Sequence, residues 1–403
     1  MALRYKLRSL TTTIRHHSTS PSPSPSAVLN PTSTTPLTSK EKSRAALSLL
    51  RTETNPERIL EICRAASLTP QSHLDRLAFS KAVNKLKAKN YYHGIRTFIE
   101  ECKERPDNLS ERCVAHFIVL YGQAGLLGDA VETFEGLEKL GIERSVLTLN
   151  SLLFACVLAG DYGEMKRVYV DLSRKYGVVA NLETYNTVIK GFCESGQANA
   201  VYSVVAEMER KGVKPNGETY GAMIAGFYKE EKFEDVGKVL EMMRKSGVKP
   251  GISIYNVRIQ SLCKLKRTKE ARALLDGILS RGMSPNWVTY GHLVHGFCKE
   301  GNLEEAMRTF EEMKQRALVP ESDCYFTLVY YLCEGKDFKG ALGVYKECME
   351  KKWFPNFSIM RSLVEGLVSI SEVDEARQII GQLKEKFSTN ADKWSVIEEG
   401  LPK

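Results

Sequence analysis

The chain of 403 residues lacks several features that would assign it to common classes of protein. No apolar run approaches the ~20 residues of a membrane-spanning helix, and none of the ten cysteines forms a CxxC pair. A Gly-rich phosphate loop, a nucleophile elbow and a deaminase-type H-x-E with a later C-x-x-C are also absent. We therefore expect no membrane insertion, no disulfide framework, no catalysis, no cofactor and no small-molecule substrate.

Acidic residues are missing from the start of the chain, where the first is Glu41. The preceding segment has basic residues beside apolar ones that recur with helical spacing, at Leu3, Leu7, Leu10 and Ile14. This pattern is typical of an organellar transit peptide, and the alternative is a disordered basic tail. We assign residues 1–40 to a transit peptide and Ser/Pro linker, with the mitochondrial matrix favoured over the chloroplast.

The net charge of +8 comes from 57 basic and 49 acidic residues. The first 39 residues supply half of this excess through Arg4, Lys6, Arg8 and Arg15. The rest of the chain is only mildly basic. A surface for nucleic acid must therefore come from the local placement of charge and not from the total.

Three kinds of residue recur every 35 positions, which indicates internal repeats. Tyrosine recurs at Tyr185, Tyr220, Tyr255, Tyr290 and Tyr325. Proline recurs at Pro215, Pro250, Pro285, Pro320 and Pro355. Cysteine follows the same period at Cys193, Cys263, Cys298 and Cys333, with Tyr228 in the gap. We expect these cysteines to be small buried core residues of a protein in a reducing compartment.

Each repeat has the pattern of two helices. In residues 182–216 the first helix has one apolar face, formed by Tyr185, Ile189, Phe192 and Cys193. A second stripe follows at Val201, Val205 and Met208. Gly196 and Gly212 are predicted to end the two helices in the left-handed conformation, and Pro215 prevents continuation. A single hairpin buries little surface, so neighbouring hairpins must stack.

The period divides the chain into predicted units. Eight full repeats cover residues 76–110, 111–145, 146–181, 182–216, 217–251, 252–286, 287–321 and 322–356. Residues 41–75 are predicted to form a degenerate first hairpin, and residues 357–403 a degenerate last repeat with a capping tail. The unit at 146–181 has one extra residue, which we place in the segment 172–181.

Strings within these units resemble the pentatricopeptide repeat. They are T-Y-N-T-V-I-K-G-F-C-E-S-G at 184–196, G-V-K-P-N at 212–216 and V-T-Y-G-H-L-V-H-G-F-C-K-E-G-N-L-E-E-A at 288–306. Tetratricopeptide repeats form a similar hairpin, but have 34 residues and lack the proline column. The nearly constant length resembles the P-type subclass. The resemblance implies an all-α, right-handed superhelical solenoid of stacked helix–turn–helix repeats.

The family's base-reading positions map onto three pairs of asparagines. In the family the first helices line a groove for single-stranded RNA, and the fifth and last residues of a repeat select one base. The corresponding pairs are Asn150 with Asn181, Asn186 with Asn216, and Asn256 with Asn286. An amide can both donate and accept hydrogen bonds, and this combination is similar to one that prefers pyrimidines. The alternative is that these residues only cap helices and turns.

The other repeats depart from this pattern. Their pairs are Ser80/Ser110, Ala115/Ser145, Gly221/Gly251, Gly291/Glu321 and Phe326/Asn356. The second residue of a repeat is often apolar in the family, but here three repeats have Glu183, Glu218 and Asp323. Carboxylates at these positions would repel phosphates. The departures favour a short base-specific contact, or RNA recognised by its shape and backbone.

One further group, His292, His295 and Cys298, has metal-binding side chains close together in the sequence. Their spacing turns around a helix, and no fourth ligand is evident, so we expect no metal site. Three functional hypotheses remain. The protein binds RNA in mitochondrial gene expression, in transcript processing, stability or translation. Alternatively, it is a structural subunit of the mitochondrial ribosome that contacts rRNA and ribosomal proteins. It is otherwise a tetratricopeptide-like scaffold that binds proteins.

Overall fold

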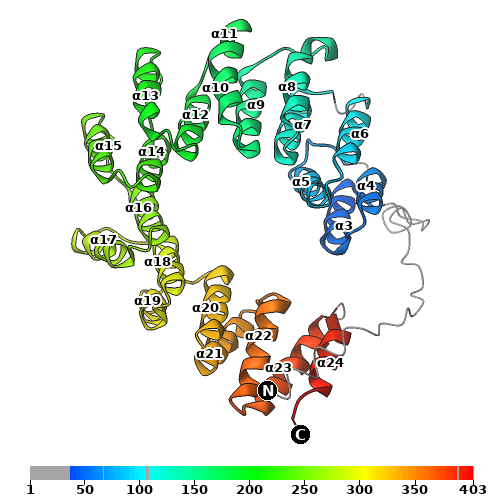
Figure 1. The fold of residues 1–403 in the computed structure, drawn as a ribbon, viewed down its shortest axis with the longest axis vertical. Coiled ribbons are helices and arrows are strands. Elements are labelled where there is room, and N and C mark those ends of the chain that lie inside the picture. The colour runs from blue at the N-terminus through cyan, green and yellow to red at the C-terminus, as the bar shows by residue number, and fades with distance from the viewer. Residues whose placement is uncertain (1–36, 67, 106–108, 388–389, 403) are drawn as a thin grey trace. The chain divides into compact units, whose positions relative to one another are not determined.

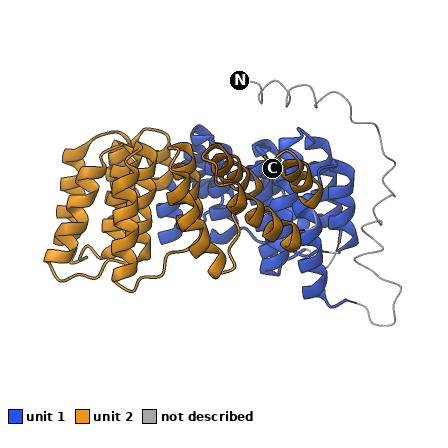
Figure 2. Ribbon diagram, turned by 90° about the horizontal axis from the view of Figure 1, so that it is seen from below, with its two compact units in different colours: residues 1–188 blue, residues 189–403 orange. Residues whose placement is uncertain are grey.

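The computed structural model describes residues 37–402, apart from 67, 106–108 and 388–389. The predicted transit peptide therefore lies, up to residue 36, outside the described residues. The described residues form helices and no strand, which confirms the all-α prediction. None of the described helices is long and apolar enough to cross a membrane. The chain divides into two compact units, residues 1–188 and 189–403, which Figure 2 colours separately.

Unit 1 consists of consecutive helical hairpins. Its helices are α3 Ser39–Thr52, α4 Pro56–Ala65, α5 His73–Ala88, α6 Tyr92–Lys103, α7 Glu111–Ala124, α8 Leu127–Glu135, the 3₁₀ turn η3 Leu137–Leu140, α9 Val146–Ala159, α10 Tyr162–Arg167, the π-helical turn η4 Val168–Leu172 and α11 Ser173–Lys175. First helices pack on first helices, so that α5 contacts α7 and α7 contacts α9. The boundary of the units falls within α12, Leu182–Glu194.

Unit 2 continues the same architecture. Its helices are η5 Ala198–Ala200, α13 Val201–Arg210, α14 Gly217–Lys229, α15 Phe233–Lys245, α16 Ile252–Lys264, α17 Thr268–Ser280, α18 Trp287–Glu300, α19 Leu303–Gln315, α20 Ser322–Glu334, α21 Phe338–Glu350, α22 Phe357–Ser369, α23 Val373–Lys386 and α24 Ala391–Glu399. The first helices α14, α16, α18, α20 and α22 pack in a row, each against the next (Figure 1). This is the α-solenoid arrangement expected of stacked repeats.

The repeated tyrosines and cysteines form the core between hairpins. All five tyrosines of the column are buried, and so are its four cysteines and Tyr228. A Cβ atom added to Gly226 would lie 2.2 Å from the Sγ atom of Cys193, and one added to Gly296 would lie 2.5 Å from that of Cys263. Successive first helices therefore approach closely where a cysteine of one meets a glycine of the next. The prediction of small buried cysteines is confirmed.

Left-handed residues end the helices, as the glycines predicted. Gly196 has a φ angle of 75° and Gly212 one of 74°. The same stop occurs without glycine in later repeats, for example at Ala317 with φ 57° and Lys352 with φ 58°. An L-residue is strained in this region because its Cβ atom crowds the backbone. The left-handed conformation at this position therefore follows from the repeat architecture, and glycine only reduces the backbone strain there.

The extra residue of the repeat 146–181 lies within its second helix. The π-helical turn η4 lengthens this helix, and the N–H of Ser173 donates to the carbonyl of Val168. Gly177, with φ 65°, then ends the helix one residue later than its counterparts in the neighbouring repeats. The extra residue thus lies at 168–172, which overlaps the predicted segment 172–181 only at Leu172. A helix absorbs one residue readily as a π turn.

The last helices cover the end of unit 2. The ring of Trp394 on α24 packs against that of Phe357 on α22, with centroids 4.8 Å apart. Trp394 is buried by this contact. The repeat boundaries given above, including the capping role of residues 357–403, remain our proposal for how the chain divides.

Candidate nucleic-acid interface

The first predicted asparagine pair forms a closed hydrogen-bond network in unit 1. The Nδ2 group of Asn150 donates to Oδ1 of Asn181 over 3.2 Å. The hydroxyl of Thr184 donates to Oδ1 of Asn150 over 2.6 Å. Oδ1 of Asn181 also accepts from the backbone N–H of Thr184 at 2.9 Å, which caps α12. Both amide oxygens are therefore already bonded within the protein.

The third pair repeats this geometry in unit 2. Asn256 donates through Nδ2 to Oδ1 of Asn286 over 3.2 Å, and the hydroxyl of Thr289 donates to Oδ1 of Asn256 over 2.7 Å. Oδ1 of Asn286 accepts from the backbone N–H of Thr289 at 3.1 Å and caps α18. Since the amide oxygens are committed, mainly N–H donors are left for an RNA base. These hydrogen bonds are those expected if the asparagines cap helices. Base reading by the same residues stays a prediction.

The members of the second pair fall in different units. Asn186 is buried on α12 in unit 1. Asn216 in unit 2 caps α14, because its Oδ1 accepts from the N–H of Thr219 at 2.9 Å and its own N–H donates to the Thr219 hydroxyl at 3.1 Å. Asn216 thus has the same capping geometry as Asn286.

A row of lysines lies at the ends of the first helices in unit 2. Lys229, Lys264 and Lys299 stand in the last turns of α14, α16 and α18, one repeat apart, and all three are exposed. The Nζ atom of Lys229 also donates to the carbonyl of Glu194 over 2.8 Å. The 35-residue spacing of these lysines is a signal in the sequence that could have predicted the row. Regularly placed cations can contact successive phosphates.

A groove of about 1,030 Å³ lies over α14, between the end of α12 and α16. Its lining includes small residues of α14 and the lysines Lys190, Lys229 and Lys264. Gly221, the fifth residue of its repeat, contributes no side chain, and Glu218 lies at the start of α14. The groove therefore combines a bare apolar floor with three lysines and with the carboxylates of Glu194 and Glu218.

A smaller cavity of about 270 Å³ lies between α18 and α20. It is lined by Trp287, which is 42 % exposed, and by His292 and His295. Burial lowers the pKa of both histidines, and the charge of Lys264 lowers that of His292 further. Both imidazoles are therefore neutral at pH 7 and add no positive charge to this surface.

The environment of Cys298 does not favour metal binding. Its side chain is buried, and burial raises the pKa of its thiol to about 12. A thiol binds metal as a thiolate, which this environment disfavours. In the described part of the chain no group of three or more His, Cys, Asp or Glu side chains is placed to hold a metal ion.

Comparison with known proteins supplies the family. Family models match as "PPR repeat family" at 180–229, "PPR repeat" at 218–248, 253–283 and 281–314, and "Pentatricopeptide repeat domain" at 120–195. The pentatricopeptide repeat-containing protein At1g11630, mitochondrial, of Arabidopsis thaliana is 53 % identical over 368 residues, which cover 91 % of each chain. The chain belongs to the pentatricopeptide repeat family.

More distant pentatricopeptide relatives match parts of the chain. The small ribosomal subunit protein mS78 (rPPR3a) of Arabidopsis thaliana is 29 % identical over 168 residues, or 42 % of each chain. Among solved structures, the pentatricopeptide repeat protein PPR10 from maize is 17 % identical, with a TM-score of 0.42. That match covers 86 % of this chain and 61 % of PPR10.

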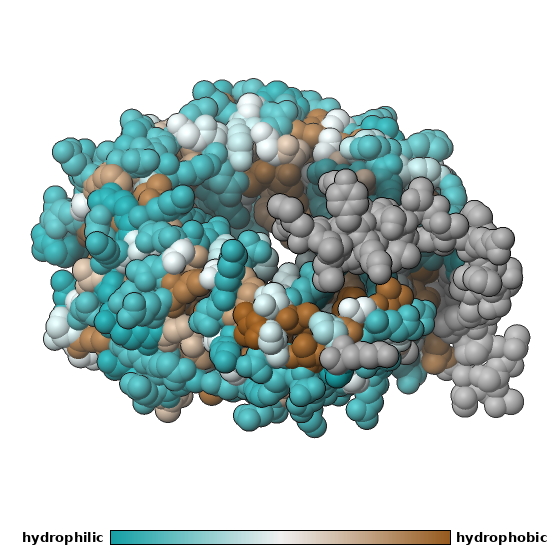
Figure 3. Space-filling view, turned by 60° about the horizontal axis from the view of Figure 1, so that its bottom comes forward, coloured by the Kyte–Doolittle hydropathy of each residue, from teal (hydrophilic) through white to brown (hydrophobic). Residues whose placement is uncertain are grey.

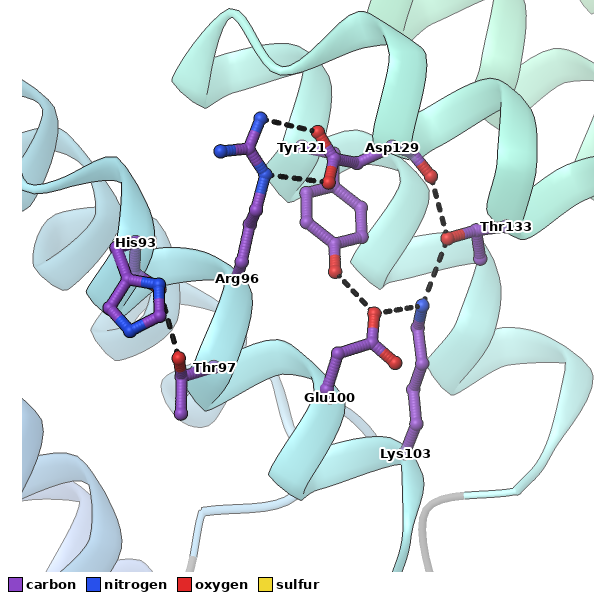
Figure 4. A network of polar contacts seen from close by, with 8 residues as sticks. All are labelled: His93, Arg96, Thr97, Glu100, Lys103, Tyr121, Asp129 and Thr133. Atoms are coloured by element: carbon purple, nitrogen blue, oxygen red, sulfur yellow. Dashed lines mark hydrogen bonds and ion pairs between the residues drawn. The ribbon is translucent and has the colours of Figure 1, made fainter.

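Neighbouring pentatricopeptide repeats of unit 1 are joined by a polar network between α6, α7 and α8 (Figure 4). Arg96 forms two hydrogen bonds with Asp129, of 2.7 and 3.0 Å. The hydroxyl of Tyr121 donates to Glu100 over 2.7 Å, and Lys103 donates to the same carboxylate over 2.8 Å. Arg96 and Lys103 are paired with carboxylates that join the hairpins, so these two cations do not form a free basic surface.

Helix α9, the first helix of its repeat in unit 1, exposes an apolar face. Leu147, Phe154 and Leu158 are 39 %, 39 % and 40 % exposed, and they lie on one side of the helix. On the face drawn in Figure 3, such apolar patches are scattered among hydrophilic side chains.

Proposed function

We propose that the protein binds RNA in the mitochondrial matrix and acts in organellar gene expression, in transcript processing, stability or translation. The observation that carries this proposal is the row of Lys229, Lys264 and Lys299 along the first helices of unit 2. A single strand that follows these helices would place phosphates near one lysine in each repeat. Binding would then depend on salt, because bound phosphates release counterions.

A second candidate is a structural subunit of the mitochondrial ribosome that contacts rRNA and ribosomal proteins. The engaged amide oxygens of Asn150, Asn181, Asn256 and Asn286 favour it, since they reduce the capacity to read a base sequence. The similarity to the ribosomal protein mS78 supports it as well. Both candidates need the same RNA-facing surface.

The lysine row can be tested with the purified full chain and single-stranded RNA. We expect the K229A/K264A/K299A variant to bind more weakly, and its slope of log affinity against log salt to fall in magnitude by about 2. A matched variant, K211A/K245A/K269A, removes three exposed lysines beside second helices, two at the ends of α13 and α15 and one in the first turn of α17. Equal affinity of the two variants would contradict the proposed path of the strand.

Sucrose gradients of mitochondria, combined with sequencing of crosslinked RNA, separate the candidates. A transcript binder should sediment apart from ribosomes and protect a short footprint. A ribosomal subunit should stay with one ribosomal subunit in salt that removes loosely bound proteins. A protein-binding scaffold should give no RNA crosslinks, and that result would refute both candidates.

The mitochondrial location can be tested separately. The full chain fused to a fluorescent protein should enter mitochondria, and a fusion that lacks residues 1–40 should not. Accumulation of the full-length fusion in chloroplasts would contradict the assigned compartment.

A further inference from the structure

The groove over α14 contains polar groups that the fold leaves unused. Ser261 is only 8 % exposed and lines this groove, yet its hydroxyl forms no hydrogen bond with any described residue. The amide of Gln260, beside it on α16, also has no partner among the described side chains and backbone groups. The hydroxyl oxygen of Ser261 opens into the groove and is therefore available to a ligand there.

Ser261 stands where other repeats have the glycine of the close helix contact. Cys193 meets Gly226, and Cys263 meets Gly296. Between α14 and α16 these two positions hold Tyr228 and Ser261 instead. The hydroxyl of Tyr228 accepts from Nε of Arg258 over 3.3 Å, and no hydrogen bond joins it to Ser261. This interface therefore presents a hydroxyl to the groove in place of a packed glycine.

The floor of the groove consists of small residues, although packing within the protein does not require glycine there. It is formed by Gly221, Ala222 and Ala225 of α14. A Cβ atom added to Gly217 would meet nothing within 4 Å, and one added to Gly221 would meet only ordinary contacts at 3.8 Å. A Cβ atom would fit at both positions without disturbing the fold. A bare surface of this kind suits the flat face of a nucleobase.

We propose that this groove binds one unpaired adenine of single-stranded RNA. The base would lie on the floor formed by α14. The amide of Gln260 would donate to N7 and accept from the N6 amino group, as amides do when they read adenine, and Ser261 would bond to the same base. Lys264, one turn after Gln260 on the same face of α16, would contact a phosphate.

This inference rests on the proposed RNA binding and extends it to a particular base. It also assigns the reading to residues other than the fifth and last of a repeat. In the repeat 217–251 those two residues are Gly221 and Gly251, which have no side chain to offer. Gln260 belongs to the next repeat and reaches the groove from α16.

The test compares short oligouridines that carry one central adenosine, guanosine or cytidine, or no substitution. We expect the full chain to bind the adenosine oligomer roughly tenfold more tightly than the others. Gln260→Ala and Gln260→Glu should abolish this preference and retain the binding of plain oligouridine. Gln315→Ala, which changes an exposed glutamine on α19, is the matched control and should retain the preference.

A second pair of variants tests the groove itself. Ala225→Leu fills the floor and should also abolish the preference for adenosine. Ala206→Leu makes the same change at an exposed position of α13 and should leave it intact. Circular dichroism and urea unfolding would verify that both variants are folded.

The outcomes separate this inference from the proposed function. If the oligomers bind and depend on the lysine row, but adenosine gives no preference or Gln260→Ala keeps it, only the adenine site is wrong. If no oligomer binds, both proposals fail. Free AMP that competes as well as the adenosine oligomer would also overturn the inference, because the site would then belong to a free nucleotide.

Discussion

The exposed faces of α9 in unit 1 and α14 in unit 2 occupy the same repeat positions but differ in chemistry. The equivalent residues are Leu147 and Glu218, Phe154 and Ala225, and Leu158 and Lys229. The buried faces, by contrast, are alike in being apolar, with Leu149 and Tyr220 at one shared position. The repeat thus fixes what is buried and leaves the exposed positions free to vary.

This contrast locates function on the exposed face of the first helices. In α16 the same three positions carry Ser253, Gln260 and Lys264, so the polar character of α14 continues into the next repeat. Stacked repeats contact only their neighbours, and one stretch can therefore specialise without disturbing another. The lysine row and the groove belong to unit 2, and the apolar face of α9 belongs to unit 1.

The largest expected effect tests whether the buried faces are equivalent. Leu149→Ala and Tyr220→Ala each remove a fully buried side chain, and we expect each to lower the free energy of unfolding by about 3–5 kcal/mol. Phe154→Ala, at an exposed position, should cost under about 1 kcal/mol. Urea unfolding monitored by circular dichroism measures all three. A small effect at only one buried position would break the equivalence.

A partly buried histidine of unit 1 makes folding sensitive to acid. Burial lowers the pKa of His116 on α7 from 6.5 to about 4, and its Nε2 atom is buried without a hydrogen bond. Below pH 6.5 the unfolded chain binds a proton that the folded protein resists until about pH 4. Folding stability is therefore lost as the pH falls through this window.

Between pH 7 and pH 5 this linkage should remove roughly 2 kcal/mol from the free energy of unfolding. His116→Phe cannot titrate and keeps an aromatic ring beside Phe79, whose centroid lies 6.1 Å from that of His116. The variant should lack this part of the acid sensitivity. Equal losses in both proteins, measured by urea unfolding at the two pH values, would contradict the assignment.

Helix stops with and without glycine give a smaller effect. Gly212→Val places a β-branched residue at φ 74°, where an added Cβ meets no neighbour, so the cost comes from the backbone alone. We expect a loss of about 1–2 kcal/mol. Ala317→Gly, the reverse exchange at φ 57°, should gain roughly 0.5–1 kcal/mol. Thermal unfolding tests both signs, and a stabilising Gly212→Val would refute the strain argument.

The sequence predicted the buried half of each repeat better than the exposed half. Tyrosine, cysteine and glycine columns are set by packing and backbone conformation, which recur in every repeat. The π turn at Val168–Leu172 was not evident, because a helix and a loop can absorb one residue equally well in sequence terms. The groove at Ser261 required coordinates, since it depends on which polar groups lack partners.

A change in RNA affinity tests the contrast between α9 and α14 most directly. Lys229→Leu gives α14 the residue type that α9 has at the same position, and it should lower RNA affinity by about 1 kcal/mol, or roughly fivefold, at low salt. Leu158→Ser, which removes an exposed leucine of α9, should leave RNA affinity unchanged. Anisotropy titrations with single-stranded RNA at two salt concentrations provide the measurement. If Leu158→Ser weakens binding as much as Lys229→Leu does, the RNA also contacts the apolar face, and the division of labour between the two helices is wrong.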